Sequence, residues 1–254
     1  MSKDSLIKVS VITVCLNAEK TIARTLDSVL SQTYEGPMEY IIKDGGSRDD
    51  TVKIADSYRE RFKERGIAYG IVSGPDKGIY DAMNQGIDLV EGELVGIINA
   101  DDIYEKGCIE TVVDRYLKTG FDLCYGDIRM ILPSGKTFIK KARLRKYTTS
   151  RDWNHPTQFV RRRLYDRFRY RCKNISDDMD LFFAVKQSGA KIEVINEVLA
   201  DFTMGGVSSK IPLREIPERI KRRYEVYTHN GYSRGYIFEC VAFELIKYVG
   251  AKFG

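Results

Sequence analysis

The sequence predicts an α/β fold with a mostly parallel, Rossmann-like central sheet, flanked by helices and followed by a helical C-terminal extension. Two observations lead to this prediction. Over about the first hundred residues, short apolar strands alternate with segments whose apolar residues recur at helical spacing. Such alternation is typical of parallel, doubly wound sheets. From residue 213 onward the spacing is helical to the end of the chain.

Four apolar, β-rich segments are the expected strands of the parallel half: 8–15, 38–43, 67–72 and 93–98. Between them, apolar residues at helical spacing predict helices over 22–30, 52–62 and 79–89. Ser47 is the expected N-cap of the second helix, because Asp50 follows three residues later as a variant of the capping box. No GxGxxG motif occurs, so a dinucleotide fingerprint is absent.

Beyond residue 102 the alternation loosens. We expect a helix over 105–118, strands over 121–132 and 136–142 around a Pro-Ser-Gly turn, a helix beginning near 177 and a last strand over 191–199. The segment 202–209 contains paired glycines and serines, and we expect it to be a mobile lid that orders over a bound ligand.

Composition restricts the protein class only loosely. A chain of 254 residues forms one large domain, or one domain with an appendage. Its net charge of +5 suits anionic small molecules, anionic membranes and nucleic acid alike, but no aromatic-basic motif supports nucleic-acid binding. The five cysteines lack CxxC spacing, which favours reduced thiols in a cytoplasmic protein. We expect neither a signal peptide nor a membrane-spanning helix.

The apolar strand over 93–98 ends in two adjacent carboxylates, within Asn99-Ala100-Asp101-Asp102. Acids at the tip of a buried strand cost desolvation energy unless a cation or hydrogen-bond donors meet them. In open α/β sheets, ligands bind beyond the carboxyl ends of the strands. A cap for the helix near residue 105 explains one aspartate well and two poorly. The pattern therefore indicates a functional site, with the cap as the alternative for one of the acids.

Five motifs follow one another in the chain: VSVITVCLNAEKTIARTLDSVLSQTY, IIKDGGSRDDT, GPDKGIYDAMNQGI, INADD and SDDMDL. In this order and spacing, residues 8–208 resemble the family 2 glycosyltransferases of the GT-A fold, of the kind found in bacterial cell-surface polysaccharide biosynthesis. The resemblance implies a GT-A domain over 1–208, with a nucleotide-binding half (1–104) and an acceptor-side half (105–208), and a helical extension over 209–254. It also implies inverting transfer of a hexosyl group from a nucleotide sugar, most simply a UDP-sugar, to a hydroxyl of a saccharide or lipid-linked acceptor, with Mn²⁺ or Mg²⁺.

The resemblance implies that Asp101 is the metal ligand. Hard divalent cations prefer oxygen ligands and offset the charge of a nucleoside diphosphate. Asn99 stands where the family more often has an acid, which leaves the metal affinity open. The donor-binding residues that the resemblance implies are Thr13, Cys15, Asn17, Glu19, Asp44, Gly45, Lys77, Asp81, Asn84, Asn99, Ala100, Asp102 and His155. Local alternatives remain: Asn17 as a helix N-cap, Gly45 as a plain turn residue and Lys77 as a solvated side chain.

An inverting transfer needs one general base for the acceptor hydroxyl. By resemblance this base is Asp178, with Asp177 as the second candidate. The alternative is that these acids only stabilise a helix dipole, but three acids in one helical turn exceed what capping requires, and crowding raises the pKa of a carboxyl. His155 either contacts the diphosphate or acceptor, or is a structural histidine.

The apolar segment 236–253 next to basic residues has three outcomes: packing on the core, a homodimer contact, or attachment to a membrane surface. The protein is therefore expected in the cytoplasm, either free or at the inner face of the membrane. Two other functions remain open. A sugar-nucleotide nucleotidyltransferase would need a Gly-rich phosphate loop where the sequence has Leu16-Asn17-Ala18-Glu19. A catalytically degenerate, nucleotide-sugar-binding module would be consistent with Asn99.

Overall fold

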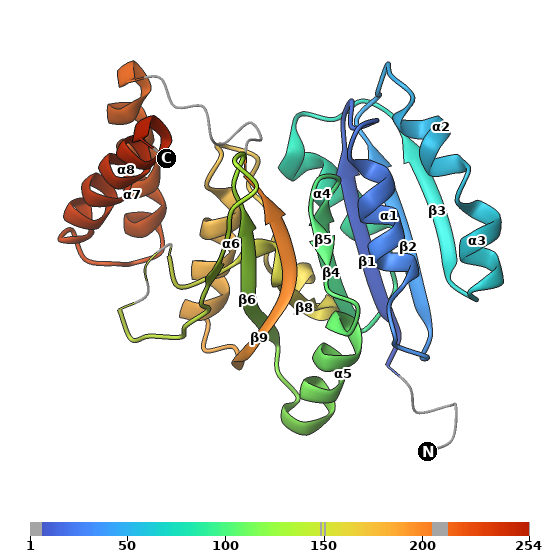
Figure 1. Ribbon diagram of the computed structural model, residues 1–254. Helices are drawn as coiled ribbons and strands as arrows, with labels where there is room; N and C mark the ends of the chain where they lie inside the picture. Colours follow the sequence, from blue (N-terminus) through green and yellow to red (C-terminus); the bar gives the residue numbers. More distant parts are fainter. Residues whose placement is uncertain (1–6, 148, 150, 205–212, 254) are drawn as a thin grey trace.

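The computed structural model describes residues 7–147, 149, 151–204 and 213–253 (Figure 1). Its strands are β1 (Val9–Cys15), β2 (Met38–Asp44), β3 (Ala68–Ser73), β4 (Leu94–Asn99), β5 (Ile103–Tyr104), β6 (Leu123–Ile131), β7 (Thr137–Lys140), β8 (Phe159–Arg161) and β9 (Ile192–Thr203). Its α-helices are α1 (Ile22–Leu30), α2 (Thr51–Asp56), α3 (Arg59–Glu64), α4 (Ile79–Asp88), α5 (Cys108–Thr119), α6 (Asp177–Gln187), α7 (Ile216–His229) and α8 (Tyr236–Phe253). Short 3-10 turns are η2 (His155–Thr157), η3 (Arg162–Asp166) and η4 (Leu213–Glu215).

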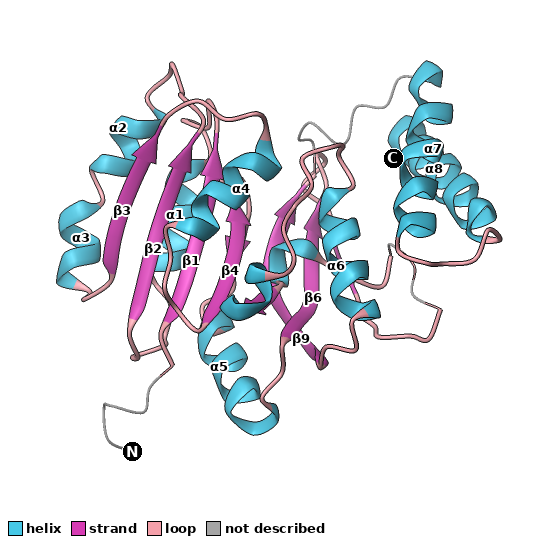
Figure 2. Ribbon diagram, turned by 180° about the vertical axis from the view of Figure 1, so that it is seen from behind, coloured by secondary structure: helices cyan, strands magenta, loops and turns pink. Residues whose placement is uncertain are grey.

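The first four strands form a parallel half-sheet in the order β3-β2-β1-β4. All seven residues of β1 are buried, and they alternate between two apolar layers. Val11 packs into the layer that contains Leu26 of α1, while Ile12 packs into the layer that contains Met83 of α4. Helices thus cover both faces of the half-sheet, α4 on one side and α1 on the other (Figure 2). The carboxyl ends of the four strands therefore meet at one edge, where ligands of such sheets bind.

The rest of the sheet is mixed in direction. β8 lies antiparallel between β4 and β6, and β6 runs parallel to β9. The β6–β9 register shifts between Gly126 and Ile128, as at a β-bulge. β5 pairs with β9 at the edge, and β7 forms a hairpin with β6. β5 and β8 contain only two and three residues, too few for a periodic pattern in the sequence.

The C-terminal helices α7 and α8 pack against each other and against α6 at one end of the molecule (Figure 1). Aromatic rings form this contact: Phe183 of α6 lies 4.9 Å from Tyr227 of α7, and Tyr227 lies 4.4 Å from Tyr236 of α8, between centroids. Packing on the core, one of the three expected outcomes, is therefore confirmed. α8 also leaves Phe238, Leu245 and Ile246 exposed, and no helix in the described part of the chain is both long and apolar enough to cross a membrane.

Four local expectations are wrong. Ser47 is not a helix N-cap, since α2 begins at Thr51 after Asp50; its hydroxyl is bonded to Asp44 instead, at 2.5 Å. The helix expected over 52–62 is interrupted at 57–58 and forms α2 and α3. The helix expected from 105 begins at Cys108, because β5 and a turn precede it. The last strand extends to Thr203 rather than 199, and most of the expected lid, 205–209, lies outside the described residues.

Candidate functional site

The loops that follow β1 and β2 are joined by hydrogen bonds. The backbone N–H of Asn17 donates to the Ser47 hydroxyl at 2.8 Å, and the Arg48 N–H donates to Asn17 Oδ1 at 2.9 Å. Two further bonds link Glu19 with the segment 49–50, each at 3.1 Å. Asn17 has φ of +51°, a left-handed conformation that asparagine tolerates. Asn17 is not a helix N-cap, because Thr21 occupies that position of α1.

The carboxylate of Asp44 holds the loop after β2 together. It accepts the N–H groups of Gly46 and Ser47 at 3.0 Å, together with hydroxyls of Ser47 at 2.5 Å and Ser73 at 2.6 Å. Burial alone would raise the pKa of Asp44, but the hydrogen bonds from Ser47 and Ser73 outweigh burial and lower it. Asp44 is therefore ionised, and it fixes the position of two loops at the edge of the sheet.

The other predicted residues at this edge are tightly packed. Thr13 is fully buried, and its hydroxyl lies 2.9 Å from that of Tyr40. Burial, together with the charge of Asp44, raises the pKa of the Cys15 thiol to about 12, so this thiol stays protonated. A Cβ on Gly45 would lie 2.6 Å from an Asp76 carboxylate oxygen. Any larger residue there would displace the Asp76 carboxylate, so Gly45 allows a close approach between loops in addition to the turn considered from the sequence.

The turn after β4 presents one carboxylate outward and buries the other. Asp101 is half-buried, and burial raises its pKa. Asp102 is fully buried; the Thr203 N–H donates to its Oδ1 at 3.4 Å, and burial followed by the charge of Asp101 raises its pKa well above the usual range. Ala100 is also buried, and the Asn99 side-chain oxygen has no hydrogen-bond partner in the described structure. Asp101 is therefore the acid of this turn that a ligand could reach.

The residues at this turn could supply part of the coordination shell of a divalent cation, with a bound substrate supplying the rest. Within the described ranges, no group of three or more His, Cys, Asp or Glu side chains could hold a metal ion. None of the described Lys or Arg side chains forms an ion pair with Asp101, and the charge of Arg24 only partly offsets the desolvation of the Asp101 carboxylate. Mg²⁺ and Mn²⁺ commonly bind through one or two carboxylates, with substrate phosphates and waters completing the shell. Asp101 could serve as such a ligand.

The start of α4 is built by its own side chains. Asp81 accepts the Lys77 N–H at 2.9 Å and the Gln85 side-chain amide at 2.8 Å. Lys77 itself is exposed. Asn84 bonds the main chain of Tyr170 twice, at 2.8 Å and 3.2 Å. Asp81 therefore shapes the helix start, and Asn84 fixes the 170 segment to α4, in addition to any contact that they make with a ligand.

The three acids in the first turn of α6 lie in different surroundings. Asp177 is 2% exposed and accepts the N–H groups of Lys173 and Asn174, at 2.6 Å and 3.1 Å. Asp180 is also buried, and it bonds the Asn230 amide at 2.7 Å. Asp178 is half-buried and lines a cavity. The structure therefore separates Asp178, which a ligand could reach, from two acids that are used within the fold.

An aromatic group connects α4 with the surroundings of Asp178. The His155 Nε2 lies 2.9 Å from the Tyr170 hydroxyl, and Tyr170 stacks on Tyr80 of α4 at 5.4 Å. The Tyr80 hydroxyl donates to the Ile175 carbonyl at 2.9 Å, just before α6. Burial lowers the pKa of His155, although the charge of Asp178 acts in the opposite direction. The ring is therefore neutral at neutral pH.

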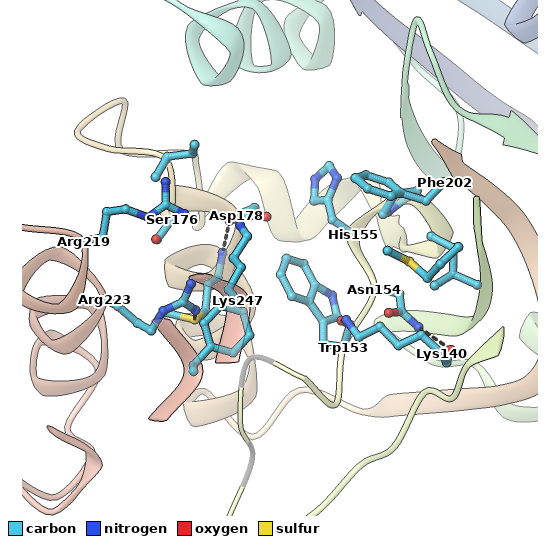
Figure 3. Close-up of a pocket in the computed structure, with 16 residues that line it drawn as sticks. Lys140, Trp153, Asn154, His155, Ser176, Asp178, Phe202, Arg219, Arg223 and Lys247 are labelled. Atoms are coloured by element: carbon cyan, nitrogen blue, oxygen red, sulfur yellow. Dashed lines mark hydrogen bonds between the residues drawn. The ribbon is translucent and has the colours of Figure 1, made fainter. Parts of the chain in front are cut away.

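A cavity of about 260 Å³ lies between α6, the sheet and the C-terminal helices; we call it the α6–α8 cavity. Figure 3 shows Asp178 and Lys247 in its centre, the arginines on one side and Trp153 with Lys140 on the other. Its lining comprises Ile128, Met130, Lys140, Trp153, Asn154, His155, Pro156, Ile175, Ser176, Asp178, Met179, Phe202, Arg219, Arg223, Phe243 and Lys247. Sequence reasoning identified only His155 and Asp178 here. The spacing of Arg219 and Arg223 predicts that both lie on one face of a helix. It does not predict which element that face packs against.

Comparison with known proteins agrees with this architecture. Residues 10–190 match the model of glycosyl transferase family 2. The "PGL/p-HBAD biosynthesis glycosyltransferase" of Mycobacterium bovis is 36% identical over 125 residues, which are 48% of this chain and 46% of that protein. Glycosyltransferase AglE of Haloferax volcanii is 30% identical over 134 residues, 52% of this chain and 43% of that one. The matches span about half the length of these relatives.

Two solved structures share the fold. TarS 1–349 of S. aureus in complex with UDP-GlcNAc superposes with a TM-score of 0.65 at 18% identity, over 96% of this chain and 73% of that one. The mannosyltransferase PcManGT from Pyrobaculum calidifontis, in complex with GDP-Man and Mn²⁺, gives a TM-score of 0.69 at 15% identity, over 98% and 75%. The fold is of the GT-A type. Because the family model covers more than half of its residues, the chain belongs to glycosyl transferase family 2.

Proposed function

We propose that the protein is an inverting glycosyltransferase of glycan biosynthesis, which moves a hexosyl group from a UDP-sugar to a hydroxyl of a saccharide or lipid-linked acceptor. One observation carries the proposal: the outward carboxylate of Asp101 and the cavity with Asp178 are connected through the end of β9. Thr203 bonds Asp102, next to Asp101, while the adjacent Phe202 lines the α6–α8 cavity. A donor held at the sheet edge would thus adjoin an acceptor held in the cavity.

The donor would bind at the carboxyl ends of β1, β2 and β4. The joined loops there are held by hydrogen bonds before any ligand arrives, so little ordering is needed on binding. Asp101 would hold Mn²⁺ or Mg²⁺, which supplies charge neutralisation for the departing nucleoside diphosphate. The solved relatives with UDP-GlcNAc and with GDP-Man and Mn²⁺ support this donor class.

The acceptor would bind beside Asp178. As the acceptor oxygen forms its bond to the anomeric carbon, the bond to the diphosphate oxygen breaks and Asp178 takes the hydroxyl proton. The neutral His155 ring, fixed by Tyr170, would bound the site without adding charge. A nucleotidyltransferase is less well supported, because the segment after β1 lacks a Gly-rich phosphate loop and is bonded to the loop after β2.

The test is calorimetry with UDP in the presence and absence of Mn²⁺, on the parent and on Asp101→Ala, followed by assays of donor hydrolysis and transfer. We expect metal-dependent UDP binding that Asp101→Ala loses while the protein stays folded. Metal-dependent binding that survives in the folded variant would overturn the role of Asp101. Binding without turnover of any donor would leave a nucleotide-sugar-binding module in place of an enzyme.

A further inference from the structure

The α6–α8 cavity collects basic side chains from three separate elements. Lys140 comes from β7, Arg219 and Arg223 from α7, and Lys247 from α8. Two carboxylates oppose these four positive charges directly: Asp178 in the lining, and Glu244, which bonds both arginines. A third, Asp152, acts on Lys140 from outside the lining, but it is itself paired with Arg145 at 3.5 Å. Apart from that pair, four positive and two negative formal charges leave an excess of two positive charges around one partly apolar cavity.

The excess is shared between the arginines and the lysines. Glu244 lies 3.0 Å from Arg219 and 3.0 Å from Arg223, and its single charge offsets one of the two guanidinium charges. The Lys140 ammonium donates to the Trp153 carbonyl at 2.9 Å, a neutral acceptor. Lys247 forms no hydrogen bond or ion pair with another described residue. Burial lowers the pKa of both lysines to about 8, although the charge of Asp152 acts in the opposite direction on Lys140, as does that of Glu244 on Lys247.

We propose that this cavity binds a phosphate group of the acceptor, through Lys247 and Lys140 with the arginines behind them. The inference rests on the proposed glycosyl transfer and names the chemical class of its acceptor. A phosphate monoester carries nearly two negative charges at neutral pH, equal to the excess in the cavity. Lysine binds phosphate as a compact point charge, while arginine offers paired donors. Trp153, Phe202 and Phe243 would contact the apolar part of the acceptor.

Lys247 lies beside Asp178: the two side chains interact electrostatically and lie together in Figure 3. A phosphate on Lys247 would thus adjoin the carboxylate proposed as the general base.

The test uses phenyl phosphate as the probe, titrated calorimetrically into protein saturated with UDP so that the donor site is occupied. Phenyl β-glucoside is the neutral comparison. We expect phenyl phosphate to bind and the glucoside to bind at least tenfold more weakly. Lys247→Met keeps the alkyl chain but removes the charge. It should weaken the binding of phenyl phosphate about tenfold or more, as the loss of a charge-assisted hydrogen bond does. Lys140→Met serves as the second variant.

Lys221→Met is the matched control, because Lys221 is exposed on α7 and does not line the cavity. It should bind phenyl phosphate as the parent does. Equal affinity in Lys247→Met and the parent, or no binding of phenyl phosphate at all, would overturn the proposal. UDP affinity, measured in the same samples, reports the donor site separately: intact UDP binding without phosphate binding rejects this inference and leaves the proposed function standing.

A phosphate could also be the headgroup of a membrane lipid. A second arm therefore measures binding to phosphatidylcholine vesicles with and without phosphatidic acid. Vesicle binding that is lost in Lys247→Met and kept in Lys221→Met assigns the headgroup to the cavity and supports the proposal. Vesicle binding that is lost in Lys221→Met alone, with phenyl phosphate unbound, would assign anion recognition to the outer surface and overturn it.

Discussion

Two neighbouring aspartates in the first turn of α6 differ in their surroundings and therefore in their availability to a ligand. Asp177 and Asp178 are adjacent in sequence, and both match the motif of the resembled family. Burial raises the pKa of Asp177 although two backbone N–H groups bond it. Its carboxylate is thereby used to hold the segment 173–174 against the start of α6. The Asp178 carboxylate accepts the Met179 N–H at 2.8 Å and interacts with Tyr80, and it lines the cavity.

The substitution Asp178→Asn should separate catalysis from donor binding. It preserves shape but cannot accept a proton, so transfer should fall by about 10²–10⁴-fold, while UDP affinity stays at the parent value. Transfer kinetics and UDP calorimetry on one sample measure both quantities. Asp177→Asn is the paired comparison: it should lower stability with a smaller effect on turnover. Near-normal transfer by Asp178→Asn would remove this residue from the mechanism.

His155 should make the stability of the protein depend on pH. Burial lowers its folded pKa below the ordinary 6.5, so the unfolded chain takes up a proton first as the pH falls. The stabilising contribution of the neutral ring is therefore complete above about pH 6.5 and is lost as the pH falls through the lowered folded pKa. His155→Gln should lose less unfolding free energy than the parent between about pH 7.5 and about pH 5.5.

The other histidine of the chain provides the control. His229 is exposed in the last turn of α7, where its ring is not buried on folding. Urea titrations of His229→Gln should follow the pH dependence of the parent. If His155→Gln also follows the parent, burial of the His155 ring does not contribute to the acid sensitivity of this protein.

Among the helices, α7 and α8 are held together by a buried ion cluster. Glu244 of α8 is 1% exposed, and Arg219 and Arg223 of α7 are 12% and 10% exposed. Glu244→Gln leaves two desolvated guanidinium groups without a carboxylate, which should cost about 3–5 kcal/mol of unfolding free energy. Glu218→Gln breaks an exposed pair with Arg222 on the same helix and should cost less than about 1 kcal/mol. Equal losses in urea titrations would contradict this account.

The sequence predicts those elements whose residues carry their own pattern. β1 to β4 with α1 and α4 were predicted within a few residues, because runs of buried β-branched residues and helical spacing are local signals. β5 and β8 exist only through pairing with β9, β4 and β6, so their short segments carry no such signal. Ser47 has the sequence pattern of a cap, but the tertiary bond to Asp44 prevails.

Some residues of the candidate site could likewise be predicted from the sequence, and others could not. The acids at strand and helix ends could be predicted, because they stand out against apolar runs. The basic lining of the α6–α8 cavity could not be predicted, because Lys140 and Lys247 are more than a hundred residues apart in sequence. They come together because α8 packs on α7, which in turn packs on α6. In the sequence, Lys247 is one of two lysines of a helix, and nothing shows which element that helix packs against.

At the scale of the whole molecule, the two halves share one sheet. β8 bonds β4 on one side and β6 on the other, and the bonds of Asn84 and Thr203 cross between the halves. We therefore expect a single cooperative unfolding transition. Peptide-resolved thiol labelling in urea should expose the buried Cys15 and Cys124, one from each half, at the same midpoint, while the exposed Cys172 reacts throughout. Separate midpoints would show two independently stable units.

Trp153 is the one tryptophan of the chain, and it stands in the wall of the α6–α8 cavity. Its ring is 5% exposed, stacks on Phe182 at 5.1 Å, and donates through Nε1 to Gln158 at 2.8 Å. Light absorbed by indole and not by tyrosine therefore excites a single fluorophore, whose emission depends on the polarity and charge around it. An occupant of the cavity should change its colour or intensity, whereas no residue of the loops after β1 and β2 lines the cavity. The fluorescence of Trp153 should therefore report, without any label, when the cavity fills.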